Sequence, residues 1–395
     1  MSSPPAAASR FRLPLSPSHV AAGFVAVLVG YTSSVAIIFQ AAQAAGASPA
    51  QLASWMWALG IGMGTTCIGL SLYFRTPILT AWSTPGAALL VTGLDGLTMH
   101  EAIGVFLLTS TLLTLAGATG SFQRLMTFVP RHLAAAMLAG ILVRFGMDAF
   151  SSMQTQPVLV AAMFGTWLFA RFLFPRYTVP LALMCGIIVA GILGLLHLNT
   201  LDWTPARPVF MTPEFSWSAF IGVAIPLFIV SVTSQNVPGL AVLRANGYTT
   251  PASPLVGWTG FAGLVLGPFG GFSFNLAAIT AAICMSREAD PQPERRYMAA
   301  VWAGLFYLLT GIFGATVVSL FSAFPAELVA AIAGLALLGT IATSLAGALG
   351  EEQGRDAAIV TFLCTASGLA LFGIGSAFWG LILGMLVHWM RARAV

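Results

Sequence analysis

Two short motifs in opposite halves of this chain are copies of each other. Residues 80–90 read TAWSTPGAALL and residues 270–280 read GGFSFNLAAIT, so that the pair WS aligns with FS and the run AAL aligns with AAI. Further matches follow in the same order: 130–136 with 325–331, Gly117 with Gly311, and Gly120 with Gly314. Paired segments that are short and interrupted by Gly and Pro are typical of the binding site of a duplicated secondary transporter. The repeat therefore predicts a transport protein with its site at these two motifs.

The composition places such a chain in a membrane. Hydrophobic residues make up 58% of the 395 residues and charged residues only 7%, whereas a soluble domain has roughly 25% charged residues. The residues before Ser18 are polar and lead into a full-length apolar segment, so we expect no cleaved signal peptide. The arginines are scattered singly, which argues against nucleic-acid binding. The four cysteines lie unpaired in apolar segments, and no metal or other cofactor is expected.

Hydropathy divides the chain into fourteen expected membrane segments. They cover approximately 20–43, 50–73, 77–92, 100–119, 130–150, 157–174, 178–197, 217–236, 252–268, 271–286, 297–319, 325–348, 356–374 and 376–392. The third and tenth segments are too short for ordinary spanning helices, and they carry the matched motifs.

The distribution of arginine supports this count and gives an orientation. With a cytoplasmic N-terminus, every arginine except Arg144 and Arg207 falls on the cytoplasmic side, in agreement with the positive-inside rule. Seven segments per half is an odd number, so the second half is expected to be inverted relative to the first. The polar stretch 199–216 would join the halves on the outside.

The matched motifs predict extended chain followed by half-helices. Thr84 before Pro85 is typical of an N-cap and a first helical residue. In the second motif, Gly270 and Gly271 oppose a helix start, residues 272–274 are expected to be extended, and Asn275 is the expected N-cap. Two half-helix N-termini that meet at the membrane midplane would form an anion site from backbone N–H groups. The alternative is that the aromatic, Pro and Gly residues are ordinary membrane-helix features.

Polar side chains on the first and eighth segments are expected beside this site. Ser33 and Ser34 belong to a polar stripe, and Gln235 and Asn236 precede a Pro-Gly pair. Such amides face a cavity or, alternatively, join helices through hydrogen bonds. No Asp or Glu lies at the expected midplane site, which favours an anionic over a cationic substrate.

On these residues the chain resembles the bacterial benzoate:proton symporters, from about residue 18 to residue 390. It is more distantly similar to the nucleobase permeases and sulfate-type anion transporters. The resemblance implies an all-α membrane protein of fourteen segments in a seven-plus-seven inverted repeat. It implies a core domain (19–125 and 217–320), a gate domain (126–198 and 321–393) and the linker 199–216, with substrate between segments 3 and 10. The acids by which the permeases bind a base have no counterpart near Gln235 or at 275–280, which argues against a nucleobase.

The leading hypothesis is proton-coupled import of benzoate or a similar aromatic carboxylate by alternating access. The carboxylate would bind the N–H groups after Thr84 and Asn275, and the ring would lie among Trp82, Phe272 and Phe274. The full candidate substrate-binding set is Ser33, Ser34, Trp82, Ser83, Thr84, Gly86, Gln235, Asn236, Phe272, Ser273, Phe274, Asn275 and Thr280.

Three alternatives remain open at this point. A carrier of another small anion, such as sulfate or bicarbonate, could use the same site. A membrane enzyme would need clustered His, Asp or Glu, but the five histidines are dispersed, so no enzyme is expected. A channel is disfavoured by the duplicated core and gate. We expect a multi-pass protein of the bacterial inner membrane with both termini cytoplasmic, with the lipid bilayer, protons and an aromatic anion as partners. A homodimer is compatible with the sequence.

Overall fold

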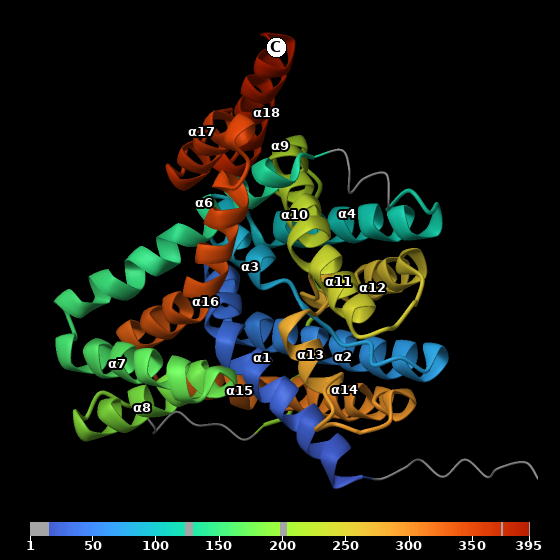
Figure 1. Cartoon of the computed structure of the whole chain (residues 1–395). Coiled ribbons are helices and arrows are strands. Elements are labelled where there is room, and N and C mark those ends of the chain that lie inside the picture. Colours follow the sequence, from blue (N-terminus) through green and yellow to red (C-terminus); the bar gives the residue numbers. More distant parts are fainter. Residues whose placement is uncertain (1–15, 123–128, 198–203, 373, 395) are drawn as a thin grey trace, which may run out of the picture.

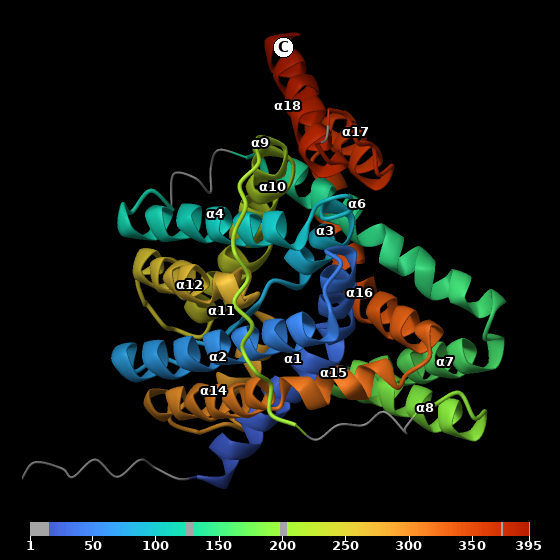
Figure 2. The ribbon, with the colours of Figure 1, turned by 180° about the vertical axis from the view of Figure 1, so that it is seen from behind.

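The computed structural model describes residues 16–122, 129–197, 204–372 and 374–394. The described chain is mostly helical, and its only named strands, β1 and β2, are three residues each. The expected domain boundaries at 125/126 and 198/199 lie outside the described residues. Figures 1 and 2 show the helices of the two halves interleaved, with α1 beside α2, α13 and α14.

The first half contains ten named elements among the described residues, of which η1 (Ser152–Gln154) is a short 3-10 turn after α6 and the other nine position the site. They are α1 (Pro17–Ala44), α2 (Pro49–Phe74), β1 (Thr80–Trp82), α3 (Thr84–Gly93), α4 (Met99–Ala118), α6 (Arg131–Ser151), α7 (Pro157–Leu173), the 3-10 turn η2 (Pro175–Tyr177) and α8 (Thr178–Ile192). Local sequence explains several starts. Ser48 and Gln51 form a capping box at α2, and Thr98 and Glu101 form another at α4.

The second half opens on a long irregular helix. It runs from α9 (Trp217–Ala219) through the π-helical segment Phe220–Ala224, α10 (Ile225–Val230) and the π-helical segment Ser231–Asn236 to α11 (Val237–Ala245). Besides three 3-10 turns, the remaining described elements are α12 (Ala252–Leu266), β2 (Phe274–Leu276), α13 (Ile279–Cys284), α14 (Tyr297–Ile312), α15 (Gly314–Ser322), α16 (Ala326–Leu349), α17 (Arg355–Ala366) and α18 (Ser376–Ala394).

Fewer helices meet a length-and-hydropathy test for spanning than the sequence predicts segments. Seven described helices pass it, or eight if the bent pair 293–312 and 314–322 counts as one span. That pair turns by 67°, whereas the sequence predicted one continuous segment at 297–319. Half-helices such as α3 and α13 are too short to pass. The count of fourteen crossings therefore stays a prediction.

The repeat is visible in how corresponding helices pack. Helix α2 packs on α14, and α4 packs on α12. A Cβ on Gly60 would lie 2.4 Å from the Gly311 Cα, and one on Gly117 would lie 2.3 Å from the Gly257 Cα. Gly117 and Gly311 are matched by the sequence repeat, so both copies use the same glycine for a close helix crossing. Small residues of this kind let membrane helices approach closely.

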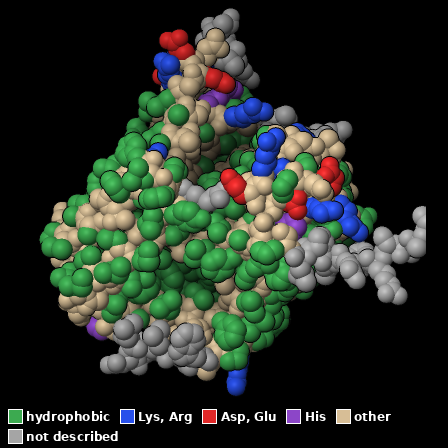
Figure 3. Space-filling view, turned by 60° about the horizontal axis from the view of Figure 1, so that its bottom comes forward, with side chains coloured by type: hydrophobic (Ala, Val, Ile, Leu, Met, Phe, Trp, Pro, Cys, Tyr) green, Lys and Arg blue, Asp and Glu red, His purple; other side chains and the backbone are tan. Residues whose placement is uncertain are grey.

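The surface has the character expected of a membrane protein. Large apolar side chains such as Phe172, Ile192 and Trp217 are each more than three-quarters exposed. Figure 3 shows a mostly hydrophobic face on which the charged side chains gather toward one edge. An apolar surface of this extent would not be stable in water.

The close crossing of α2 and α14 can be tested by adding one methyl group. Gly60→Ala places its Cβ against the backbone of Gly311 and should destabilise the protein by about 1–3 kcal/mol through overpacking. Gly69→Ala on the same helix is the control, because a Cβ there meets nothing within 4 Å. Thermal unfolding in detergent should give a lower midpoint for the first variant only; equal midpoints would contradict this packing.

Candidate functional site

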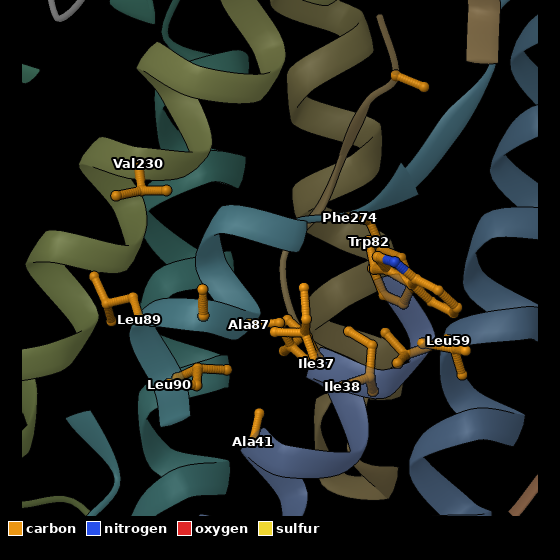
Figure 4. Packing of buried hydrophobic residues seen from close by; sticks show 14 of the residues in the cluster. Ile37, Ile38, Ala41, Leu59, Trp82, Ala87, Leu89, Leu90, Val230 and Phe274 are labelled. Atoms are coloured by element: carbon orange, nitrogen blue, oxygen red, sulfur yellow. The ribbon is translucent and has the colours of Figure 1, made fainter. Parts of the chain in front are cut away.

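The two matched motifs meet as a pair of antiparallel strands. Trp82 on β1 is paired with Phe274 on β2. The ladder continues beyond the strands, because the Ser83 N–H donates to the Ser273 carbonyl at 3.1 Å. Figure 4 shows Trp82 and Phe274 side by side. The place where β1 and β2 pair is called the crossing below. The pairing satisfies the unwound backbone of both motifs inside the protein.

The first half-helix begins one residue earlier than predicted. Its N-cap is Ser83 rather than Thr84, and the Ser83 Oγ accepts from the Gly86 N–H at 2.9 Å. The Ser83 carbonyl accepts from the Ala87 N–H at 2.7 Å, and Pro85 has no N–H. Most first-turn donors of α3 are therefore already occupied. The Gly86 N–H is therefore not free for a ligand, and the anion site at the two half-helix N-termini stays a prediction.

The second motif departs further from the prediction. Asn275 is not a helix cap, because it lies inside β2, and α13 begins at Ile279 with Ala278 at the N-cap and no side-chain cap bond. The extended stretch is Phe274–Leu276, not 272–274. The cause is long-range: pairing with β1 satisfies the backbone here and postpones the helix.

Asn236 and Asn275 form a buried network behind the strands. The Asn236 Nδ2 donates to the Asn275 Oδ1 at 2.8 Å, and the Asn236 Oδ1 accepts from the Leu276 N–H at 3.0 Å. The Asn275 Nδ2 donates to the Ser273 carbonyl at 2.6 Å. The hydroxyls of Ser231 and Ser273 are also hydrogen-bonded to each other. Both asparagines are 0% exposed, so the network holds the crossing together instead of meeting a ligand.

A cavity of about 640 Å³ lies on the other side of the crossing. Its walls come from α1, β1, α3, the 231–236 segment, α11, α13 and α14, and from η2, α8 and α16 opposite. The candidate residues that line it are Ser33, Ser34, Trp82, Thr84, Gln235 and Thr280. The candidates outside the cavity lining are Ser83, Gly86, Asn236, Phe272, Ser273, Phe274 and Asn275.

The two phenylalanines face the protein core. Phe272 packs against Trp55 and Phe106, with ring centroids 5.9 and 5.4 Å away. The Phe274 ring packs so closely on α2 that a Cβ on Gly62 would lie 2.2 Å from it. The expectation that both rings face the substrate is therefore wrong. Both rings are almost fully buried and are absent from the cavity lining.

Of the three aromatic residues predicted to hold the ring, Trp82 is the one that lines the cavity. Its Nε1–H donates to the Ser34 Oγ at 2.7 Å, and the Tyr31 ring packs on it edge to face at 4.8 Å. The Ser33 and Ser34 hydroxyls donate to the Gly30 carbonyl at 3.0 and 2.9 Å. These bonds fix the orientation of the indole at the cavity wall.

Ser234, beside Gln235 in the polar stretch of the eighth segment, also lines the cavity. Sequence reasoning missed three polar lining residues on two other helices, namely Tyr307 on α14 and Thr340 and Thr343 on α16. Thr340 and Thr343 lie three apart on one face of α16. A Thr or Tyr in an apolar helix usually indicates packing or a bond to its own backbone, as the Thr343 Oγ1 makes to the Gly339 carbonyl. Among the described lining residues none is acidic or basic, and the polar groups are hydroxyls, an amide and an indole.

Comparison with known sequences identifies the family. A sequence model of the benzoate membrane transport protein family matches residues 13–390. The chain belongs to this family. The benzoate membrane transport protein of Acinetobacter baylyi is 43% identical over 376 residues, which are 95% of each chain. Inner membrane protein YdcO of Escherichia coli K12 is 53% identical over 368 residues, which are 93% of this chain and 94% of YdcO.

Solved structures share the fold of this benzoate-transport family member at low sequence identity. SLC26A9 has a TM-score of 0.60 at 12% identity, with 93% of this chain covered; the chain spans 65% of the length of SLC26A9. The transmembrane domain of the cyanobacterial bicarbonate transporter BicA has a TM-score of 0.58 at 13% identity, with 95% of this chain and 97% of BicA covered.

The two neighbours Gln235 and Asn236 should behave differently in this family member. Asn236→Ala leaves the buried Leu276 N–H without an acceptor and should cost about 1–3 kcal/mol of stability. Gln235→Ala changes a cavity-lining side chain and should leave the unfolding temperature nearly unchanged. Thermal unfolding in detergent measures both. A Gln235→Ala protein as unstable as Asn236→Ala would contradict the division between network and lining.

Proposed function

We propose that this protein imports benzoate or a similar aromatic carboxylate together with protons, by alternating access. The observation that carries the proposal is the cavity at the crossing of the two motifs, in a chain that belongs to the benzoate transport family. Its volume of about 640 Å³ lies in the range of roughly 300–1,000 Å³ typical of small-molecule sites. A mostly apolar wall with a few polar groups suits an aromatic ring bearing one carboxylate.

The lining residues suggest how the substrate is held. The carboxylate is bound by hydroxyl and amide side chains near the starts of α3 and α13, namely Thr84, Thr280 and Gln235. The positive end of the α3 dipole adds a favourable field there. The ring lies along Trp82 and apolar neighbours such as Ala277. Side chains take the place of backbone amides that the sequence alone suggested, since the Gly86 and Ala87 N–H groups of α3 are occupied.

The two walls of the cavity supply the moving parts of the proposed mechanism. The crossing and its helices belong to the core, 19–125 and 217–320, while α16 and α8 belong to the gate, 126–198 and 321–393. Motion of the core against the gate exposes the cavity to each side of the membrane in turn. The stretch 199–216 acts as the outside linker.

The setting of this transport is the bacterial inner membrane. Support comes from the apolar spans of the chain and from the name of its relative, inner membrane protein YdcO. Both termini are proposed to be cytoplasmic, on the basis of the arginine distribution. Homodimer formation remains part of the proposal.

Uptake of labelled benzoate into proteoliposomes is the direct test of this function. We expect saturable uptake that rises when the outside is made more acidic than the inside. Liposomes without protein are the control. Absence of saturable uptake would overturn the substrate assignment, and saturable uptake without a response to the acid gradient would overturn the proton coupling alone.

A carrier of another small anion is the second candidate. The named activity of BicA, bicarbonate transport, on the same fold favours this candidate over other classes. Competition separates the two: unlabelled benzoate should suppress the uptake of labelled benzoate, and sulfate or bicarbonate in equal amount should not. The reverse order of competition would favour the alternative.

Gln235 offers a test of substrate charge. Gln235→Glu places a negative charge beside the carboxylate, and like charges about 4 Å apart repel by about 4 kcal/mol at an effective dielectric of about 20. Benzoate affinity should therefore collapse at neutral pH and recover at acid pH, where the new carboxyl or the substrate is protonated. Gln235→Leu, the control, should show a modest loss without recovery. If benzoate affinity depends on pH in the same way in the two variants, Gln235 does not contact the substrate.

A further inference from the structure

Tyr307 on α14 is a buried side chain with an unusual hydroxyl. It lines the cavity, although the residue is only 1% exposed. Among the described residues its Oη has no hydrogen-bond partner, as is also true of the neighbouring Tyr31 Oη, whereas the Trp82 indole and the Ser33 and Ser34 hydroxyls are all paired. A buried phenol hydroxyl without a partner costs free energy. A group that enters the cavity could supply the missing acceptor.

Three elements meet around this hydroxyl. A Cβ built on Gly30 of α1 would lie 3.2 Å from the Tyr307 Oη and 3.6 Å from the Thr280 Cγ2. Gly30 itself lines the cavity. Because Gly30 has no side chain, the Tyr307 hydroxyl can lie close against α1, where even a Cβ would be crowded. Thr280, the second residue of α13, lies near the same glycine and also lines the cavity, so two hydroxyl-bearing residues border the cavity here.

The hydroxyl groups of Tyr307 and Thr280 indicate which chemical group of a ligand would bind in this part of the cavity. A phenol O–H is a donor in search of an acceptor, and an ionised carboxylate offers only acceptors. A hydrogen bond to a charged group is shorter and stronger than one between neutral groups. We propose that the Tyr307 hydroxyl donates to the carboxylate of the substrate where Tyr307 and Thr280 both line the cavity. The inference rests on the proposed transport of an aromatic carboxylate and names a residue that recognises its charged group.

Tyr31 provides a matched comparison within the same cluster. It packs against Tyr307 with ring centroids 6.3 Å apart, and it is almost as deeply buried, at 8% exposed. Its hydroxyl is also without a hydrogen-bond partner, but it is fully buried, and Tyr31 is not among the residues that line the cavity. Removal of either hydroxyl changes the packing little, but only one removal should change recognition.

The experiment measures binding by calorimetry on the purified full-length protein in detergent. The probes are benzoate and benzamide, which has the same ring but a neutral carbonyl. Tyr307→Phe should weaken benzoate binding by about ten- to a hundredfold, the loss of a hydrogen bond to a charged group, and weaken benzamide binding clearly less. Tyr31→Phe should leave both affinities unchanged.

The outcomes separate this inference from the function on which it rests. An equal loss for both probes in Tyr307→Phe would mean that the residue only supports the cavity and would overturn its role in charge recognition. An unchanged benzoate affinity would overturn that role as well. Both results leave the proposed function standing if the wild-type protein binds benzoate. A wild-type protein that binds no benzoate would overturn the proposed function and this inference together.

Discussion

The rest of this structure depends on how the backbone N–H and C=O groups of two short extended stretches, β1 and β2, are hydrogen-bonded. At membrane depth, each backbone N–H or C=O without a partner costs several kcal/mol, so extended chain survives there only when protein satisfies it. β1 and β2 meet this demand by pairing with each other, and the Ser83 N–H extends the ladder to the Ser273 carbonyl. Because the partners come from opposite halves of the chain, neither half can complete the crossing alone.

At the crossing, some polar side chains are buried in a hydrogen-bond network and others line the cavity. Behind the strands, Asn236 and Asn275 use their amides on each other and on the backbone, and they are fully buried. In front of the strands, Gln235 and Thr84 border the cavity. Neighbours such as Gln235 and Asn236 therefore have different tasks. Substitution of the buried pair should affect folding first, whereas substitution of the lining should affect binding first.

Local sequence predicted where the helices are interrupted, but not that the interrupted segments pair with each other as strands. Pro85 and Gly270 act on their own backbone, so the extended segments and the approach of the two motifs could be inferred, as could Trp82 at the cavity. The role of Asn275 could not, because a strand partner from the other half replaced the helix cap. Phe272 and Phe274 face the core because their packing partners, such as Trp55 and Phe106, come from α2 and α4, which lie far from them in the sequence. Tyr307 was missed because a tyrosine in an apolar helix resembles a packing residue.

A structure with bound substrate tests the central claim most directly. Crystals grown with 4-bromobenzoate would give an anomalous bromine signal that marks the ring position without ambiguity. The account predicts this signal in the cavity between the β1–β2 crossing and α16, with the carboxylate toward Thr280 and the ring along Trp82. A signal behind the strands, against Phe272 and Phe274, or between other helices would contradict it.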